Sequence, residues 1–183
     1  MDILQKIILE KEKEIMAKSV EHAYIFDEQG NIFSRKVGIS EQISFTTSEL
    51  NSFKDKIFIH NHTEDATSLS DKDIILSIIY QFKEIRAVGK VKDKMVRYSA
   101  TPKMNKIKLN DALKGAFYNV RKLLNKYIID ADNKIYHAFN NDLKKNKINK
   151  EWAEFNHLHY INKRLNQTLK TIGIELNYKR EII

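Results

Sequence analysis

A short segment in the first half of the chain constrains its fold and its chemistry more than any other. The apolar run Ile57–Ile59, typical of a buried strand, leads directly into His60 and, two residues on, His62. Because residues i and i+2 of a strand point to the same face, the two imidazoles are expected to lie side by side. An apolar stretch with helical spacing begins near Asp73, and Ser70 stands where the N-cap of that helix is expected. A strand, a loop and a helix start thus bring two imidazoles and a carboxylate toward one point.

These side chains together are typical of a metal site. Two histidines and one carboxylate leave a fourth coordination position for water, which is the pattern of catalytic rather than structural zinc sites. We therefore expect one Zn²⁺ per chain, held by His60, His62 and Asp73, although Fe²⁺, Co²⁺ and Mn²⁺ bind the same ligand types. A second interpretation needs no metal: two histidines beside a strand can be surface residues, and Ser70 with Asp73 can serve only to cap a helix.

The spacing also resembles a known signature. A histidine pair H-x-H, a serine eight residues after the second histidine and an aspartate three residues later resemble the motif of the JAMM (JAB/MPN) metalloprotease family. The run HNHTEDATSLSDKD is closest in wording to the RadC-like bacterial branch of that family. Ser68 and Asp71 also satisfy S-x-x-D, but they fall two residues short of the family interval, so Ser70 and Asp73 are preferred. Thr63 replaces the proline that usually follows the second histidine, which affects the direction of the loop more than metal binding.

The resemblance implies a further carboxylate at the start of an early strand. Glu21 fits this position, because it directly precedes the β-type run 22–26. Glu28 is the rival carboxylate, but it lies in the turn at the other end of that run. In the implied mechanism the histidines and Asp73 hold the metal, Glu21 acts as general base and then general acid, and Ser70 hydrogen-bonds the oxyanion. The implied reaction is hydrolysis of a peptide or isopeptide bond in a protein substrate, in many family members one that carries a ubiquitin-like modifier.

The order of elements predicts an α/β fold of the α+β type. The patterns predict, in chain order, a helix over 2–18, a hairpin over 21–37, a helical turn over 46–53, a strand over 56–62, a helix over 71–83, and strands over 85–92 and 95–100. The resemblance implies that these elements form a JAB/MPN-like (cytidine-deaminase-like) mixed sheet with flanking helices. Pro102, the only proline, marks the expected end of this first domain, residues 1–102.

The remaining residues, 103–183, are predicted to form a basic helical extension packed on or beside that domain. Apolar residues keep helical spacing from Leu113 to Leu143 and again from Trp152 to Ile172, with a Lys/Asn-rich break between the two stretches. Gly173 is the expected end of the second helix. The simplest arrangement is a helical hairpin. Alternating apolar residues over 174–178 can add an edge strand.

The net charge of +8 belongs entirely to the C-terminal part. Residues 1–102 carry 15 Lys/Arg against 16 Asp/Glu, a net −1, whereas residues 103–183 carry 17 against 8, a net +9. One interpretation is that the C-terminal helices contact nucleic acid or an acidic protein. The other is compositional, since the chain is rich in Lys, Asn and Ile. Without cysteine, a long apolar run or a secretory pattern at its start, the chain is expected to be cytoplasmic and to have no membrane partner.

Two functions therefore remain open. The first is a zinc metallopeptidase, and the second is a non-catalytic binding module on the same fold, whose basic helices contact nucleic acid or an acidic protein. Nucleic-acid binding weakens steeply with salt, whereas peptidase activity responds to chelator and to loss of Glu21. The other histidines favour neither function: His157 and His159 fall in a helical stripe, where residues i and i+2 diverge by about 200°. Both are expected, like His137, to be packing or surface residues.

Overall fold

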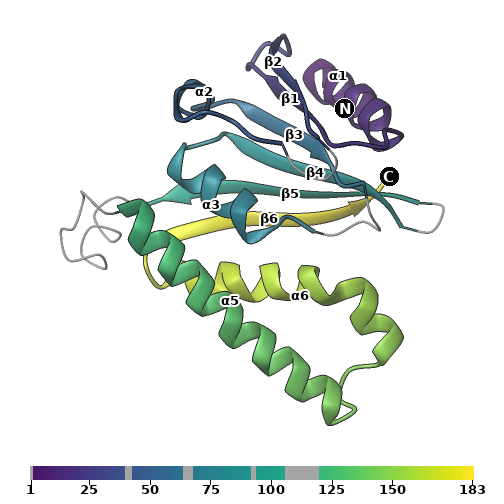
Figure 1. Cartoon of the computed structure of the whole chain (residues 1–183), viewed down its shortest axis with the longest axis vertical. Coiled ribbons are helices and arrows are strands. Elements are labelled where there is room, and N and C mark those ends of the chain that lie inside the picture. Colours follow the sequence, from purple (N-terminus) through teal and green to yellow (C-terminus); the bar gives the residue numbers. More distant parts are fainter. Residues whose placement is uncertain (1, 40–42, 64–67, 92–93, 106–119) are drawn as a thin grey trace.

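The computed structural model describes residues 2–39, 43–63, 68–91, 94–105 and 120–183. In these ranges the chain forms a mixed six-stranded sheet with helices on both faces (Figure 1). The helices are α1 (Ile3–Met16), α2 (Thr47–Ser52), α3 (Asp71–Ile79), α5 (Val120–Lys144) and α6 (Lys150–Lys170). The strands are β1 (His22–Phe26), β2 (Ile32–Val37), β3 (Ile57–Asn61), β4 (Glu84–Val91), β5 (Lys94–Met104) and β6 (Ile174–Ile182). This arrangement confirms the predicted α+β class.

The strands lie in the order β2-β1-β3-β4-β5-β6. Neighbouring strands are antiparallel except β3 and β4, which are parallel and are joined by the crossover helix α3. In the register, Ala23 of β1 lies opposite His60 of β3, and His60 lies beside Ala87 of β4. The candidate ligands thus lie at the two ends of one connection. The histidines lie at the end of β3, and Asp73 lies at the start of α3.

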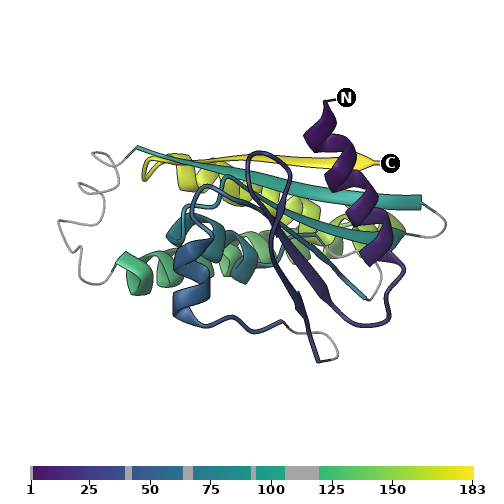
Figure 2. The same cartoon turned by 90° about the horizontal axis from the view of Figure 1, so that it is seen from above.

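Successive side chains along each strand point to opposite faces of the sheet, and this divides the core into two layers. Helix α1 packs on one face, where Ile8 and Ile15 join buried strand residues such as Ile59. The other face carries α2, α3 and α6 (Figure 2). Residues such as Phe58 and Ala87 are buried in the core on this face. Because His60 is two residues after Phe58, its side chain lies on the face that α3 covers.

Two predicted element ends were wrong, and each has a physical reason. The helix predicted over 71–83 ends at Ile79, since Gln81 takes a left-handed conformation (φ 53°) and the chain turns back into β4. The strand predicted to end at residue 100 continues through Pro102 to Met104. Proline is tolerated there because β5 pairs only with β6 beyond Ala100. No bond to β4 is therefore lost through the missing N–H.

The C-terminal part joins the sheet as well as packing beside it. Helices α5 and α6 contact each other as the predicted hairpin, and α6 also contacts β6. The edge strand predicted over 174–178 is confirmed and extends to Ile182, paired with β5 along its length. The predicted helical stripe near Leu113 lies in part outside the described residues, as does the connection at 92–93. Among the helices that the structure describes, none combines the length and apolar character that crossing a membrane requires.

Candidate metal centre

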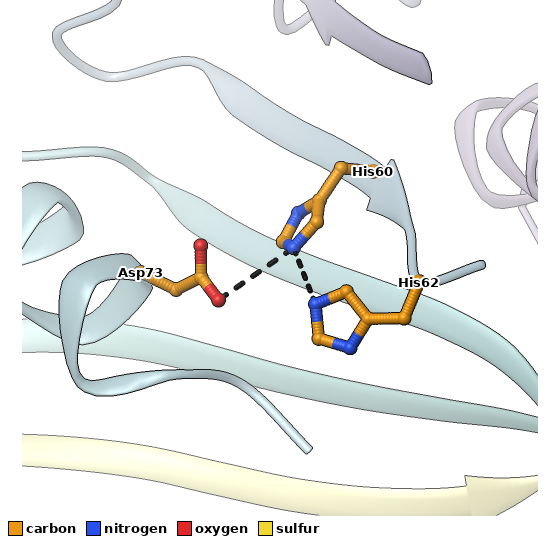
Figure 3. Close-up of side chains that lie close together, drawn as sticks. All are labelled: His60, His62 and Asp73. Atoms are coloured by element: carbon orange, nitrogen blue, oxygen red, sulfur yellow. Dashed lines mark hydrogen bonds and ion pairs between the residues drawn. The ribbon is translucent and has the colours of Figure 1, made fainter. Parts of the chain in front are cut away.

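The end of β3 presents two histidines to the same side of the sheet. His60 is the buried penultimate residue of the strand, and His62 follows directly after its end. The N–H of His62 donates to the carbonyl of Val88 at 2.9 Å, which continues the pairing with β4 and keeps the backbone extended. The Nε2 atoms of His60 and His62 lie 3.1 Å apart (Figure 3). The predicted same-face arrangement of the two imidazoles is therefore present.

The carboxylate comes from the first turn of α3. Ser70 is the N-cap, and it forms a reciprocal capping box with Asp73. Oδ2 of Asp73 accepts hydrogen bonds from the backbone N–H of Ser70 at 2.8 Å and from its hydroxyl at 2.7 Å. The same oxygen lies 3.6 Å from Nε2 of His60 (Figure 3). The cap therefore aims the carboxylate at the histidines.

Two imidazole nitrogens and a carboxylate oxygen converge closely enough to share one cation. One ligand atom from each of His60, His62 and Asp73 lies within 4.8 Å of the other two. Tetrahedral zinc with bonds of about 2.0–2.1 Å places its ligand atoms about 3.3 Å apart. The separations of 3.1 Å and 3.6 Å measured from Nε2 of His60 bracket that value. The donor types and their spacing thus fit a zinc ion.

The electrostatics of the site also favour a positive charge between these groups. Burial lowers the pKa of His60, but the Asp73 carboxylate, together with Glu21 and the backbone of Arg86, raises it, so that the pKa lies above its ordinary value. Burial would raise the pKa of Asp73, but the two histidines and the Ser70 hydroxyl lower it well below its ordinary value. Nε2 of His60 has at most one proton and faces both His62 and Asp73. A cation held at this point would satisfy all three side chains.

The second nitrogen of His60 is less well supported. Its Nδ1 atom is buried and makes no hydrogen bond of ordinary geometry, although the backbone of Arg86 is close enough to help raise the pKa of the ring. Histidines that bind metal usually donate the N–H of this second nitrogen to a carbonyl or carboxylate. Packing against rings such as Phe58, 5.6 Å away between centroids, therefore orients His60 on this side.

Glu21 lies beside the cluster but is not one of its three members. It directly precedes β1, and its carbonyl accepts a hydrogen bond from the N–H of Gly38 at 2.8 Å. The pairing of β1 with β3, continued by two residues, places Glu21 opposite His62. Its negative charge contributes to the raised pKa of His60. The structure therefore brings Glu21 to the end of the sheet at which the three candidate ligands lie.

Asn61, between the two histidines, has a role that the motif spacing did not predict. Its side chain is fully buried, its Oδ1 accepts from the N–H of His22 at 2.6 Å, and its Nδ2 donates to the carbonyl of Val20 at 3.2 Å. These two bonds hold the backbone on either side of Glu21. An H-x-H pattern leaves its middle residue open, so only the amide chemistry of asparagine could have suggested such a contact.

The rival residues lie elsewhere. Ser68 bonds to the C-terminal elements, and Asp71 is not part of the three-residue cluster. Glu28 pairs with Lys83 at 2.9 Å, at the opposite end of β1 from Glu21. His159 packs against Tyr178 and His137 is exposed, as predicted, whereas the side chain of His157 lies outside the described part of the chain.

Comparisons of the chain with protein-family models, with curated proteins and with solved structures find no match. The functional interpretation therefore rests on the residues of the chain and on their geometry.

Proposed function

We propose that the chain is a zinc-dependent hydrolase of the JAMM (JAB/MPN) type that cleaves a peptide or isopeptide bond in a protein. The observation that carries this proposal is the convergence of His60, His62 and Asp73, with ligand atoms within 4.8 Å of one another. A strand end and a crossover-helix start supply these residues in the order and spacing of the family motif. The mixed sheet with helices on both faces is compatible with the fold that the resemblance implies.

The ligand set itself favours a catalytic role over a structural one. Three protein ligands leave one coordination position open, whereas structural zinc sites are closed by four protein ligands. When bound, zinc polarises a carbonyl and lowers the pKa of a water from about 15.7 to about 7. His62 is only partly buried, so the described residues do not enclose the cluster on the side where this histidine lies.

Glu21 is the proposed general base and acid. Its carboxylate is close enough to the cluster to influence His60, and the side chain is partly exposed rather than enclosed. A carboxylate in this place takes the proton of the attacking water and returns it to the leaving amine, which contributes typically about 10²–10⁴-fold to the rate. Hydrogen bonds from Gly38 and Asn61 hold the backbone around Glu21, so its carboxylate extends from a fixed position.

Ser70 has two proposed roles that use the same proton. In the structure its hydroxyl donates to Asp73, which orients that ligand. Stabilisation of an oxyanion requires the hydroxyl to turn away from Asp73. The backbone N–H of Ser70 keeps its own bond to Oδ2 of Asp73 when this happens. The carboxylate therefore stays anchored while the hydroxyl serves the reaction, at a site where one donor is worth about 10²–10³-fold in kcat.

The proposed substrates are folded proteins with an extended peptide or an isopeptide branch, among them conjugates of ubiquitin-like modifiers.

A second candidate function is a binding module for nucleic acid or an acidic protein. It is favoured by Lys144, Lys145 and Lys147, which are all exposed at the turn between α5 and α6. Replacing these three lysines by alanine should reduce such binding and flatten its salt dependence, without altering hydrolysis.

The test of the hydrolase proposal starts from the metal. Purified wild-type chain should contain about one zinc by mass spectrometry, and the variant His60→Ala/His62→Ala should contain none. His137→Ala is the matched control, because His137 is exposed on α5 and should leave the zinc in place. Zinc-loaded protein is then assayed on peptide and isopeptide substrates beside Glu21→Gln, which should keep zinc and lose hydrolysis. A wild-type chain that takes up no zinc when it is supplied overturns the proposal, and so does full activity in Glu21→Gln.

A further inference from the structure

The loop that leads into α3 is held by a hydrogen-bond network from the opposite end of the chain. Oγ of Ser68 lies 2.6 Å from the hydroxyl of Tyr178 in β6 and accepts a bond from Nδ2 of Asn162 in α6 at 2.9 Å. Nδ2 of Asn162 also donates to the carbonyl of Leu69 at 2.7 Å, so both protons of this amide are used on adjacent residues. His159 completes the network, with Nδ1 3.0 Å from the Tyr178 hydroxyl.

Burial makes this network costly to disturb. Ser68 is 2% exposed and Asn162 is 3% exposed, so water does not readily replace a lost partner. A buried polar group left without its partner carries the full penalty of its lost hydration. The side chain of Leu69 is also buried, in the same core cluster as Leu165 and Leu176 of the C-terminal elements. Polar and apolar contacts from α6 and β6 thus fix the same two residues.

These two residues directly precede the capping box of the candidate metal site. Ser70 follows Leu69, and it is Ser70 that bonds Oδ2 of Asp73 through its N–H and its hydroxyl. The position of Ser70 therefore depends on the backbone that α6 and β6 hold. A displacement of this backbone moves the carboxylate relative to His60, which it faces at 3.6 Å.

We propose that Asn162 and Tyr178 are positioning residues for the metal ligand Asp73. This inference rests on the proposed function, in that it takes the three-residue cluster to bind zinc. The C-terminal part then has a role in the site itself, besides any surface that it offers to a partner. Partners that support a ligand directly are typically worth 10–100-fold in metal affinity. Asn162 and Tyr178 act one residue further away, so we expect about 3- to 10-fold for each.

The experiment compares zinc affinity in Asn162→Ala, Tyr178→Phe and Asn166→Ala by competition with a chromophoric chelator. Asn166 is the matched control: it lies one turn further along α6 and joins that helix to β6, accepting from the N–H of Leu176 at 2.8 Å, away from Ser68 and Leu69. Unfolding midpoints of the metal-free proteins are measured in parallel. The first two variants should weaken zinc binding, and Asn166→Ala should bind zinc with wild-type affinity even where its midpoint falls. Tyr178→Phe removes a single hydroxyl and provides the test if Asn162→Ala does not fold.

Two further measurements separate positioning from a general loss of stability. The visible absorption of the Co²⁺-substituted protein reports ligand geometry, and it should change in Tyr178→Phe but not in Asn166→Ala. In a Ser70→Ala background, adding Tyr178→Phe should weaken zinc binding by a smaller factor than in the wild type, because only the backbone N–H of residue 70 still links this path to Asp73. Additive losses would overturn the proposed path.

The outcomes distinguish this inference from the proposed function. If the wild-type chain binds no zinc, the proposed function fails and this inference falls with it. If the wild-type chain binds zinc and Asn162→Ala and Tyr178→Phe bind it equally well, only the inference is overturned. It is also overturned if Asn166→Ala weakens binding as much as they do, since the effect would then follow stability alone.

Discussion

The hydroxyl of Ser70 donates a 2.7 Å hydrogen bond to Oδ2 of Asp73, and the backbone N–H of Ser70 donates to the same oxygen at 2.8 Å. This pair is at once the N-cap of α3 and the support of the candidate ligand that faces His60. Helix capping and ligand orientation are therefore not alternatives at this position: the bond from the Ser70 N–H is half of the capping box and also anchors the carboxylate, while Oγ of Ser70 accepts the other capping bond from the N–H of Asp73 at 3.2 Å.

Replacing Ser70 by alanine should affect both roles. Loss of the cap is expected to lower the free energy of unfolding by about 1 kcal/mol. Loss of the hydroxyl bond to Asp73 should weaken zinc binding by about 10–100-fold, the usual effect of removing a group that holds a metal ligand. Chemical denaturation of the metal-free protein and zinc competition measure the two effects separately.

The capping box of α2 provides the control. Thr46 and Glu49 form the same reciprocal pair at the start of that helix. Thr46→Ala should therefore cost a similar amount of stability and leave the affinity for zinc unchanged. If both variants weaken zinc binding equally, the effect of Ser70→Ala comes from helix stability and not from the orientation of Asp73.

Asn61→Ala should separate catalysis from metal binding. The side chain holds the backbone on both sides of Glu21, so its removal frees the proposed base and leaves the N–H of His22 without its partner. We expect a loss of about 1–3 kcal/mol in unfolding free energy. Hydrolysis should fall about tenfold or more, up to the 10²–10⁴-fold that a general base contributes in full. The zinc content should stay at about one per chain, and full activity in this variant would contradict the role assigned to Asn61.

Local patterns predicted the type and order of the elements, and they placed the candidate ligands at the end of a strand and the start of a helix. The period of two along 57–62 and the S-x-x-D before an apolar stretch are short-range signals, and both match the structure. The end of α3 was missed because Phe82 keeps helical spacing although it lies beyond the helix. Its ring instead stacks on Phe58, with centroids 5.6 Å apart. Apolar spacing does not distinguish a helix from a buried loop residue.

Contacts between distant segments were not predictable in the same way. The contacts of Asn61 depend on the register of β1 against β3, which neither strand specifies alone. Asn162 and Tyr178 reach Ser68 across 94 and 110 residues of the chain. Glu12 lies within a run of five charged residues, 10–14, in the first helix, yet it is fully buried. Each of these positions is determined by tertiary packing rather than by local sequence.

The stabilisation that zinc provides should depend on pH. The pKa of His60 lies above its ordinary value of about 6.5, because Asp73, Glu21 and the backbone of Arg86 together raise it by more than burial lowers it. The pKa of Asp73 is lowered, mainly by His60, so its carboxylate stays ionised well below pH 4. In metal-free protein the His60–Asp73 ion pair therefore adds most stability between about pH 4 and 6.5 and loses it as pH rises through the raised pKa of His60.

Zinc and the proton compete for Nε2 of His60, so the metal contributes more as the pH rises. The increase in melting temperature on adding zinc should be small near about pH 5 and large near about pH 8. In Asp73→Asn the metal-free protein should lose the part of its pH dependence that comes from the ion pair. Calorimetry with zinc and with chelator measures both effects, and a zinc-dependent increase that is equal at the two pH values would contradict this assignment.

The buried ion cluster beneath α1 should matter for stability and not for the metal. Glu12 is fully buried, binds the guanidinium of Arg97, and lies 3.3 Å from that of Arg86, which is 3% exposed. Removing one partner of a buried ion pair typically costs 3–5 kcal/mol, because the other charge is left uncompensated. We expect about 3 kcal/mol for Glu12→Ala, at the lower end, since Glu84 and Gln5 still bind Arg86 at 2.8 Å.

Glu14, on the same helix, is the control for this prediction. Its ion pair with Lys11, at 2.7 Å, is largely exposed, and such pairs contribute about 0–1 kcal/mol. Denaturant unfolding should therefore distinguish Glu12→Ala clearly from Glu14→Ala. Both variants should bind zinc with wild-type affinity, because α1 packs on the face of the sheet opposite to the one that α3 covers. If Glu12→Ala were no less stable than Glu14→Ala, the cluster would not anchor α1, and packing of Ile8 and Ile15 alone would hold the helix on the sheet.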